Sequence, residues 1–249
     1  MTGAEQRDGP RAGPRDGRRN EQRNEQRNEQ RNEQRNEQRD ARRLARQLRP
    51  AATALLTVEC QRGVVGPGSE SALPELAAVA RSSGALDRVA RLVDGAHRAG
   101  VQVLHAVAER RPDGRGSGRN ARLFRAAGRL PVRQHPGTDA VRVAPPIAVA
   151  DEDIVVRRLH GLSPVAGTEV DALLRNLGRR TVVICGVSAN IAVPNAVFDL
   201  VNLGYTAVVA ADAVAGVPAE YTAAMIRHTL SLVATIADAD AVLSCWGQD

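Results

Sequence analysis

The chain contains no lysine, so all 34 of its Lys-or-Arg residues are arginine. Any role that a lysine ammonium group usually has must therefore belong to another side chain. Aromatic residues make up only 2% of the 249 residues, so Val, Leu, Ile and Ala must fill the interior. The apolar content of 43% is enough for one sizeable core.

Long apolar runs are also missing, and none approaches the ~20 residues that a membrane-spanning helix needs. The arginine-containing start has no apolar stretch after it, so neither a signal peptide nor a twin-arginine signal is expected. We therefore expect a cytoplasmic protein with no membrane partner. Three cysteines, Cys60, Cys185 and Cys245, form no spaced pair, which argues against a disulfide framework or a zinc site.

The net charge of +6 is concentrated near the N-terminus, because residues 1–50 hold 14 Arg and 9 acidic residues. Within them, residues 20–39 repeat the sequence NEQR five times. This period places like charges at i,i+4, brings no opposite charges together and leaves no apolar face. We predict that residues 1–49 are a disordered or fraying-helix tail, separate from a domain at 50–249. Nucleic-acid binding through the arginines is disfavoured by the interleaved glutamates.

The rest of the chain alternates between two kinds of pattern. Short apolar runs predict strands, and residues 84–99 carry apolar side chains at helical spacing. Such alternation predicts an α/β domain with a parallel sheet and helices on both faces. The predicted strands are 54–58, 101–107, 154–156, 181–185, 205–210 and 241–243, and the other predicted helices are 168–177, 194–203 and 218–236.

Two predicted strand ends carry groups suited to chemistry. Glu59 follows an apolar run directly, and the run Gly186–Asn190 forms a small-residue turn before a helix. Parallel sheets bind ligands at the carboxyl ends of their strands, and amides at a helix N-terminus favour anions. The sequence therefore predicts a site between these two strand ends.

Three segments in this order resemble the isochorismatase-like hydrolases, which include nicotinamidases and N-carbamoylsarcosine amidohydrolase. They are LLTVECQRGVV, DIVVRRLHGLSPVAGTEVDALLRNLG and VVICGVSANIAVPNAVFDLVNLGYTAVVAADAVAG. The resemblance covers about residues 52–245. It implies a Rossmann-like, three-layer α/β/α fold whose six-stranded, mostly parallel sheet has the order 3-2-1-4-5-6. It also implies a cis peptide at Val187-Ser188.

The resemblance places the family's catalytic Asp, Lys and Cys at Glu59, Arg158 and Ala192, with Arg157 as the alternative to Arg158. Glu keeps the carboxyl group, displaced by about one methylene. Arg keeps the positive charge but cannot act as an acid or base near neutral pH, although it can clamp a substrate carboxylate. Ala removes the nucleophile, so a thiolate mechanism is excluded at that position.

True isochorismatases resemble this chain in lacking the cysteine, and they cleave a vinyl ether with the acidic residue and water. We therefore predict a hydrolase of a small, anionic metabolite that works through Glu59, raised in pKa by desolvation. The alternative is a catalytically inactive member that binds a small molecule or serves as an oligomeric scaffold. Homo-oligomers are common in the family, so one is expected here.

No cofactor and no metal are expected, because the stretch from His105 to Arg111 lacks the Asp-x-His pattern of the metal-binding nicotinamidases. The substrate is expected to meet residues from each of the three segments and from the loop after residue 110. The predicted substrate-binding residues are Gln61, Asn120, Phe124, Arg157, His160, Val187, Ser188, Asn190 and Ile191.

Overall fold

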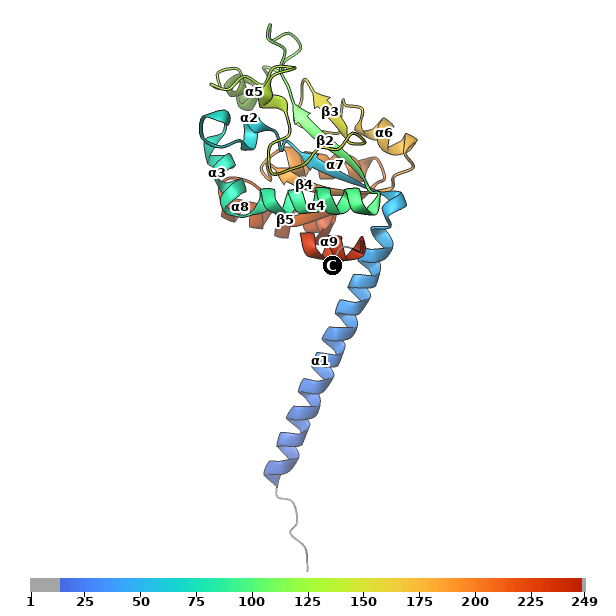
Figure 1. Ribbon diagram of the computed structural model, residues 1–249. Helices are drawn as coiled ribbons and strands as arrows, with labels where there is room; N and C mark the ends of the chain where they lie inside the picture. The colour runs from blue at the N-terminus through green and yellow to red at the C-terminus, as the bar shows by residue number, and fades with distance from the viewer. Residues whose placement is uncertain (1–13, 248–249) are drawn as a thin grey trace, which may run out of the picture. The chain divides into compact units, whose positions relative to one another are not determined.

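The structure is a computed structural model that describes residues 14–247, and the chain divides into two compact units, Met1–Arg43 and Leu44–Asp249. The described part of the first unit lies in helix α1 (Pro14–Gln47) (Figure 1). Every side chain described in this unit is exposed. A helix that is polar all round gains nothing from packing, so its stability rests on helix propensity alone. The part of the predicted tail at residues 14–47 is helical, and the prediction for residues 1–13 lies outside the described residues.

The second unit begins earlier than the predicted boundary at residue 50. Leu44 packs against the core, and Leu48 is fully buried. The indole Nε1 of Trp246, near the other end of the unit, donates to the Leu48 carbonyl over 3.2 Å. The last turn of α1 therefore belongs to the folded domain, because Leu44 in that turn and Leu48 just after it cover one end of the core.

Six parallel strands form one sheet, with the order β3-β2-β1-β4-β5-β6. The strand order reverses between β1 and β4, which are neighbours although more than a hundred residues separate them. This arrangement confirms the predicted fold class and strand order. The strands are β1 (Thr53–Val58), β2 (Gln102–Ala108), β3 (Ile154–Arg158), β4 (Thr181–Val187), β5 (Thr206–Ala215) and β6 (Thr235–Ala237).

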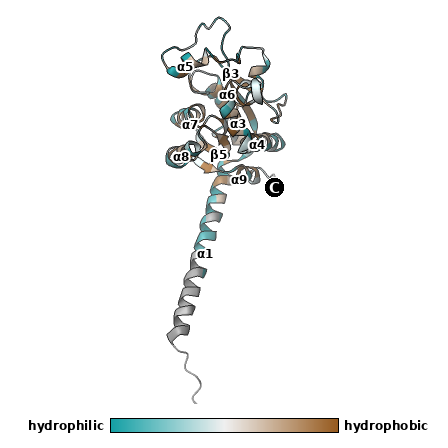
Figure 2. Cartoon of the chain, turned by 90° about the vertical axis from the view of Figure 1, so that its left-hand side faces the viewer, coloured by the Kyte–Doolittle hydropathy of each residue, from teal (hydrophilic) through white to brown (hydrophobic). Residues whose placement is uncertain are grey.

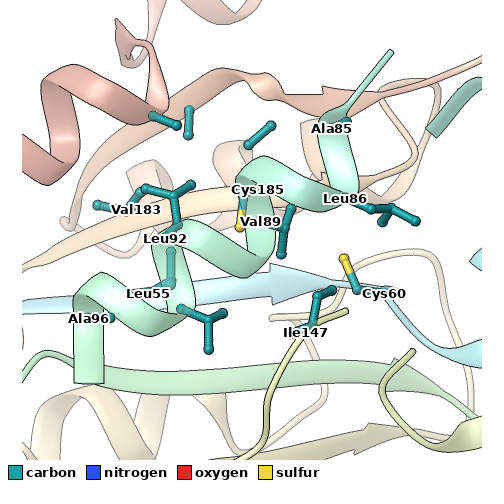
Figure 3. Close-up of a cluster of buried hydrophobic side chains, with 14 of the residues drawn as sticks. Leu55, Cys60, Ala85, Leu86, Val89, Leu92, Ala96, Ile147, Val183 and Cys185 are labelled. Atoms are coloured by element: carbon teal, nitrogen blue, oxygen red, sulfur yellow. The ribbon is translucent and has the colours of Figure 1, made fainter. Parts of the chain in front are cut away.

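Helices cover both faces of this sheet, as period-two alternation along buried strands requires. Leu55 and Val183 face the cluster that includes α4 (Ala85–Ala99), as Figure 3 shows. Leu56 and Ile184 face the opposite cluster, which includes α7 (Ala192–Asn202). Figure 2 shows the hydrophobic strands between α7 and α8 on one side and α4 and α9 on the other. The result is a three-layer α/β/α domain.

The remaining helices are short. None of the helices within residues 14–247 combines the length and the apolar character needed to cross a membrane. Their bounds are α2 (Arg62–Val65), α3 (Pro74–Ser82), α5 (Arg122–Ala127), α6 (Val170–Asn176), α8 (Ala219–His228) and α9 (Ala239–Cys245).

The C-terminal part differs from prediction. The expected strand at 241–243 lies within helix α9, and the last strand, β6, occupies residues that were predicted as the end of a long helix. The reason is local: the Asp238 carboxylate accepts a hydrogen bond from the Ala241 amide over 2.7 Å and caps α9. An apolar triplet alone cannot distinguish a strand from a buried helix turn.

A buried polar chain lies outside the predicted site. His105 on β2 is fully buried, and its Nδ1 lies 2.8 Å from the Thr57 hydroxyl. Its Nε2 lies 3.2 Å from the Asp153 carboxylate, which also pairs with His97 on α4 over 2.9 Å. Burial lowers the pKa of His105, although Asp153 opposes that shift.

We expect this histidine to make the domain less stable in mild acid. Because burial lowers the His105 pKa in the folded state, the unfolded chain, with an ordinary value near ~6.5, binds this proton more tightly, and stability falls as pH drops below that value. Urea unfolding at about pH 7.5 and about pH 5 measures how much unfolding free energy is lost between the two pH values. This loss should be smaller for His105→Gln than for the wild type. His228→Gln, at an exposed position of α8, serves as the control and should keep the wild-type dependence. An unchanged dependence in His105→Gln would contradict this assignment.

Candidate active site

Glu59 stands where β1 ends, at the point where the strand order reverses. It is the one non-glycine residue with positive φ, 49°, among residues 14–247. Its amide donates to the Ala106 carbonyl over 2.8 Å, which fixes the chain against β2. A left-handed conformation costs a residue with a side chain about 1–3 kcal/mol, and such residues cluster at functional sites. The fold therefore holds Glu59 in a backbone conformation that a residue with a side chain disfavours.

Arg158, the last residue of β3, pairs directly with Glu59. One guanidinium nitrogen, Nη2, donates to Glu59 Oε1, and the other, Nη1, donates to the Leu162 carbonyl. The two side chains are only 17% and 13% exposed, for Glu59 and Arg158 respectively. Burial raises the pKa of Glu59, and the charge and hydrogen bond of Arg158 offset only part of that rise. The carboxyl group therefore keeps its proton to a higher pH than an ordinary glutamic acid.

A cavity of about 230 Å³ opens beside this pair, and Ala192 forms part of its wall. Ala192 is the first residue of α7, so a side chain there projects from the helix N-terminus. Most of the wall is apolar. The polar lining residues are Glu59, Glu109, Arg110, Ser117, Gln134, Arg158, His160 and Ser188. The three positions at which the family's catalytic residues were expected thus surround one cavity.

The turn between β4 and α7 contributes Ser188 and Ile191 to the same wall. It contains the expected cis peptide at Val187-Ser188. Two of its amides are engaged within the protein: Ala189 N donates to Ala215 O over 2.9 Å and Ile191 N to Ser188 O over 3.3 Å. The turn therefore shapes the cavity, and these two amides are not available to a ligand.

Four of the predicted substrate-binding residues line the cavity: Phe124, His160, Ser188 and Ile191. Five others do not: Gln61, Asn120, Arg157, Val187 and Asn190.

Of those five, Gln61 is fully buried and binds Ala108 with both ends of its amide, at 2.8 and 2.6 Å. Asn190 makes a similar pair of bonds to Val217, at 2.6 and 3.0 Å. Both side chains hold loops in place, because their polar atoms are already bonded to backbone.

The other three point elsewhere. Arg157 is 61% exposed and pairs with Glu109 over 3.1 Å. It neighbours Arg158 on β3, so its side chain leaves the opposite face of the strand. Asn120 is exposed in a loop, and Val187 is buried in the core.

The structure adds four polar residues that sequence reasoning did not place at the site: Glu109, Arg110, Ser117 and Gln134. Glu109 follows β2 directly, just as Glu59 follows β1. The same signal, a carboxylate at the end of an apolar strand, could have identified it. Arg110 and Ser117 lie in an irregular loop, where sequence carries no such signal.

No cysteine lines the cavity. Cys60 and Cys185 are buried in the cluster on the α4 side of the sheet, where Figure 3 shows both thiols. Burial and the nearby Glu59 raise the pKa of Cys60 to about 12, so it carries no thiolate near neutral pH. Within residues 14–247, no group of three or more His, Cys, Asp or Glu could hold a metal ion.

The fold and the site define a three-layer α/β protein with a largely apolar cavity at the carboxyl ends of its central strands. The Isochorismatase domain family matches residues 53–241, and the chain belongs to this family of hydrolases. An uncharacterized isochorismatase family protein, YecD of Escherichia coli O157:H7, is 30% identical over 112 residues. That match covers 45% of this chain and only about half, 54%, of YecD.

Solved structures show the same fold. An isochorismatase family protein from Desulfovibrio vulgaris matches with a TM-score of 0.67 and 23% identity, over 79% of this chain and 98% of that one. A cysteine hydrolase from Pseudomonas syringae pv. phaseolicola matches with a TM-score of 0.65 and 20% identity, over 80% of this chain and 93% of that one. At these identities the likeness concerns the fold alone.

Proposed function

We propose that this protein hydrolyses a small, anionic metabolite with Glu59 as the acid, in place of cysteine chemistry. One observation carries the proposal: the Glu59 carboxyl group is desolvated at the wall of a cavity whose nucleophile position holds Ala192. Desolvation favours the protonated carboxyl group, and a protonated carboxyl group can donate to carbon or oxygen. The substrate class that fits this chemistry is a vinyl ether.

In the proposed reaction, Glu59 transfers its proton to the terminal carbon of the C=C bond. The C=C electron pair forms the new C–H bond and leaves an oxygen-stabilised cation. Water adds to that cation and returns a proton to the Glu59 carboxylate. The hemiketal then separates into a ketone and an alcohol, so the net change is the addition of one water molecule.

Arg158 has a positioning role in this proposal. Its guanidinium group donates to Glu59 and to the Leu162 carbonyl, so it fixes the carboxyl group relative to the cavity. It also stabilises the carboxylate that remains once the proton has left. The sequence suggested a substrate clamp at Arg158, but both terminal nitrogens of this guanidinium already have partners in the protein.

A turnover screen with a pH profile tests the proposal. We expect hydrolysis of carboxylate-bearing vinyl ethers and none of simple amides, because no thiol lines the cavity. The rate should fall as pH rises through the Glu59 pKa, since only the protonated form is active. Burial raises that pKa, so the fall should begin at a higher pH than for an ordinary glutamic acid. A rate that rises over the same pH range would mean that a base, not an acid, limits turnover.

Ligand binding without catalysis is the second candidate function. It is favoured by the same ion pair, because Glu59 and Arg158 each satisfy the other's charge and the nucleophile position is alanine. This candidate predicts no turnover of any vinyl ether or amide in the screen, together with saturable binding in the cavity.

We further propose a cytoplasmic homo-oligomer that uses no cofactor and no nucleic-acid partner, on the grounds of composition and family resemblance.

A further inference from the structure

Arg110 is the charged residue of the cavity that has no carboxylate partner. Glu59 pairs with Arg158, and Glu109 pairs with Arg157. No ion pair joins Arg110 to any acidic residue within the part of the chain that the structure describes. Its Nη1 donates only to a neutral group, the Phe124 carbonyl, over 3.2 Å. A guanidinium group without a carboxylate partner can donate a charge-assisted hydrogen bond to a bound anion.

The surroundings of Arg110 also favour an anion. Arg110 is half-buried and lines a second, adjoining pocket of about 150 Å³ as well as the main cavity. The charged residues of that second pocket are all basic or histidine: Arg110, Arg111, Arg133 and His135. Arg111 is paired with Asp113 over 2.8 Å, but no carboxylate of either pocket lies within ion-pair distance of Arg110, so the charge of Arg110 itself is uncompensated.

Among the described residues that line the main cavity, one buried side-chain polar group has no hydrogen-bond partner. The Ser117 hydroxyl is inaccessible to solvent and makes no hydrogen bond in the structure. A buried hydroxyl left unpaired is unfavourable, so the protein itself does not fully satisfy the polar groups of this part of the wall. Phe124 links the two polar residues, since its carbonyl accepts from Arg110 while its ring lies against Gly118, next to Ser117.

We propose that Arg110 binds the carboxylate of the substrate and selects small carboxylates with an apolar body. This inference rests on the proposed function and changes it in one respect, because it assigns anion recognition to Arg110 rather than Arg158. The apolar part of the ligand is held by leucines of the same wall, such as Leu73, Leu123 and Leu130. Arg110 acts on binding, whereas Glu59 acts on chemistry.

The binding of two probe molecules, measured near neutral pH, tests this assignment without any need for turnover. Benzoate and benzamide have nearly the same shape and differ in charge, and their affinities can be measured by NMR titration of the full chain. The wild type should prefer benzoate by about tenfold or more, the effect of one charge-assisted hydrogen bond. Arg110→Gln should lose this preference and keep its benzamide affinity, and Arg110→Lys should restore part of it.

Arg125→Gln is the matched control, since Arg125 lies on α5 next to Phe124 but is exposed and outside both pockets. It should keep the wild-type preference. If Arg110→Gln loses affinity for both probes equally, the role of Arg110 is structural, through its bond to the Phe124 carbonyl, and the proposal is overturned. A preference that survives in Arg110→Gln, a wild type with no preference, or a wild type that binds neither probe would overturn it too. A wild type that turns over nothing but retains the Arg110-dependent preference would sink the hydrolase and leave this inference standing.

Discussion

Glu59→Gln is expected to lower turnover of a carboxylate-bearing vinyl ether by about 10²–10⁴-fold, the usual contribution of a general acid. Gln keeps the size of the side chain and its ability to accept a hydrogen bond from Arg158, but it has no proton to give to carbon. The loss should appear in kcat more than in KM, because the proton is transferred only in the transition state. Steady-state kinetics at a pH where the wild type is fully active measures both constants.

Glu109→Gln is the control for this experiment. Glu109 lines the same cavity and is buried, but its carboxylate pairs with Arg157. Replacing the Glu109 carboxylate by an amide should leave kcat within a few-fold of the wild type, since no proton passes through Glu109. Thermal unfolding of both variants checks that each is folded. Similar kcat losses in the two variants would mean that general electrostatics, and not a specific acid, accounts for the rate.

Glu59→Asp sharpens the same experiment. Aspartate is the residue that the family resemblance implies at this position, but its carboxyl group would be drawn back by about one methylene. Sites tolerate displacements of only ~0.5 Å without adjustment. We therefore expect activity between that of the wild type and that of Glu59→Gln, which would show that the structure around Ala192 is adapted to the longer acid.

The sequence was most informative where secondary structure is regular. The spacing of apolar residues predicted α4 and five of the six strands, and the family resemblance supplied their order. The strand predicted at 241–243 was wrong, because an apolar triplet fits a strand or a helix turn and the cap from Asp238 decides for the helix. Tertiary pairing with β5 places β6 where the sequence suggested a continuous helix.

The site was predicted only as far as strand ends define it. Glu59 and Arg158 end strands, so a parallel sheet necessarily brings them to one edge. Arg110 and Ser117 belong to an irregular segment whose position depends on distant contacts, such as the Arg110 amide donating to Gln134 O over 2.8 Å. Gln61 illustrates the opposite error: it lies two residues after Glu59, but its side-chain amide is bonded to Ala108 and does not line the cavity.

The approach of β4 to β1 brings Glu59 close to Ala192, and it depends on the absence of a side chain at Gly186. Gly186 pairs with Val58 in the sheet and has a φ of +106°. A Cβ atom placed there would lie 2.3 Å from the Val58 carbonyl oxygen and 2.8 Å from the Cys60 sulfur. Backbone cannot yield as a flexible side chain can, so one added methyl group must separate the two strands that carry the site.

Gly186→Ala is therefore expected to destabilise the domain by about 3–5 kcal/mol, which combines backbone strain with overpacking. Gly204→Ala is the matched control, because Gly204 also has positive φ, +89°, but a Cβ atom there meets nothing within 4 Å. That variant should lose only about 1–2 kcal/mol, the cost of the backbone conformation alone. Urea unfolding of the full chain measures both, and equal losses would mean that β1 and β4 can separate freely. If Gly186→Ala still folds, its Glu59-dependent turnover should fall as well, since the strand pair that is pushed apart is the one that holds the acid beside the cavity.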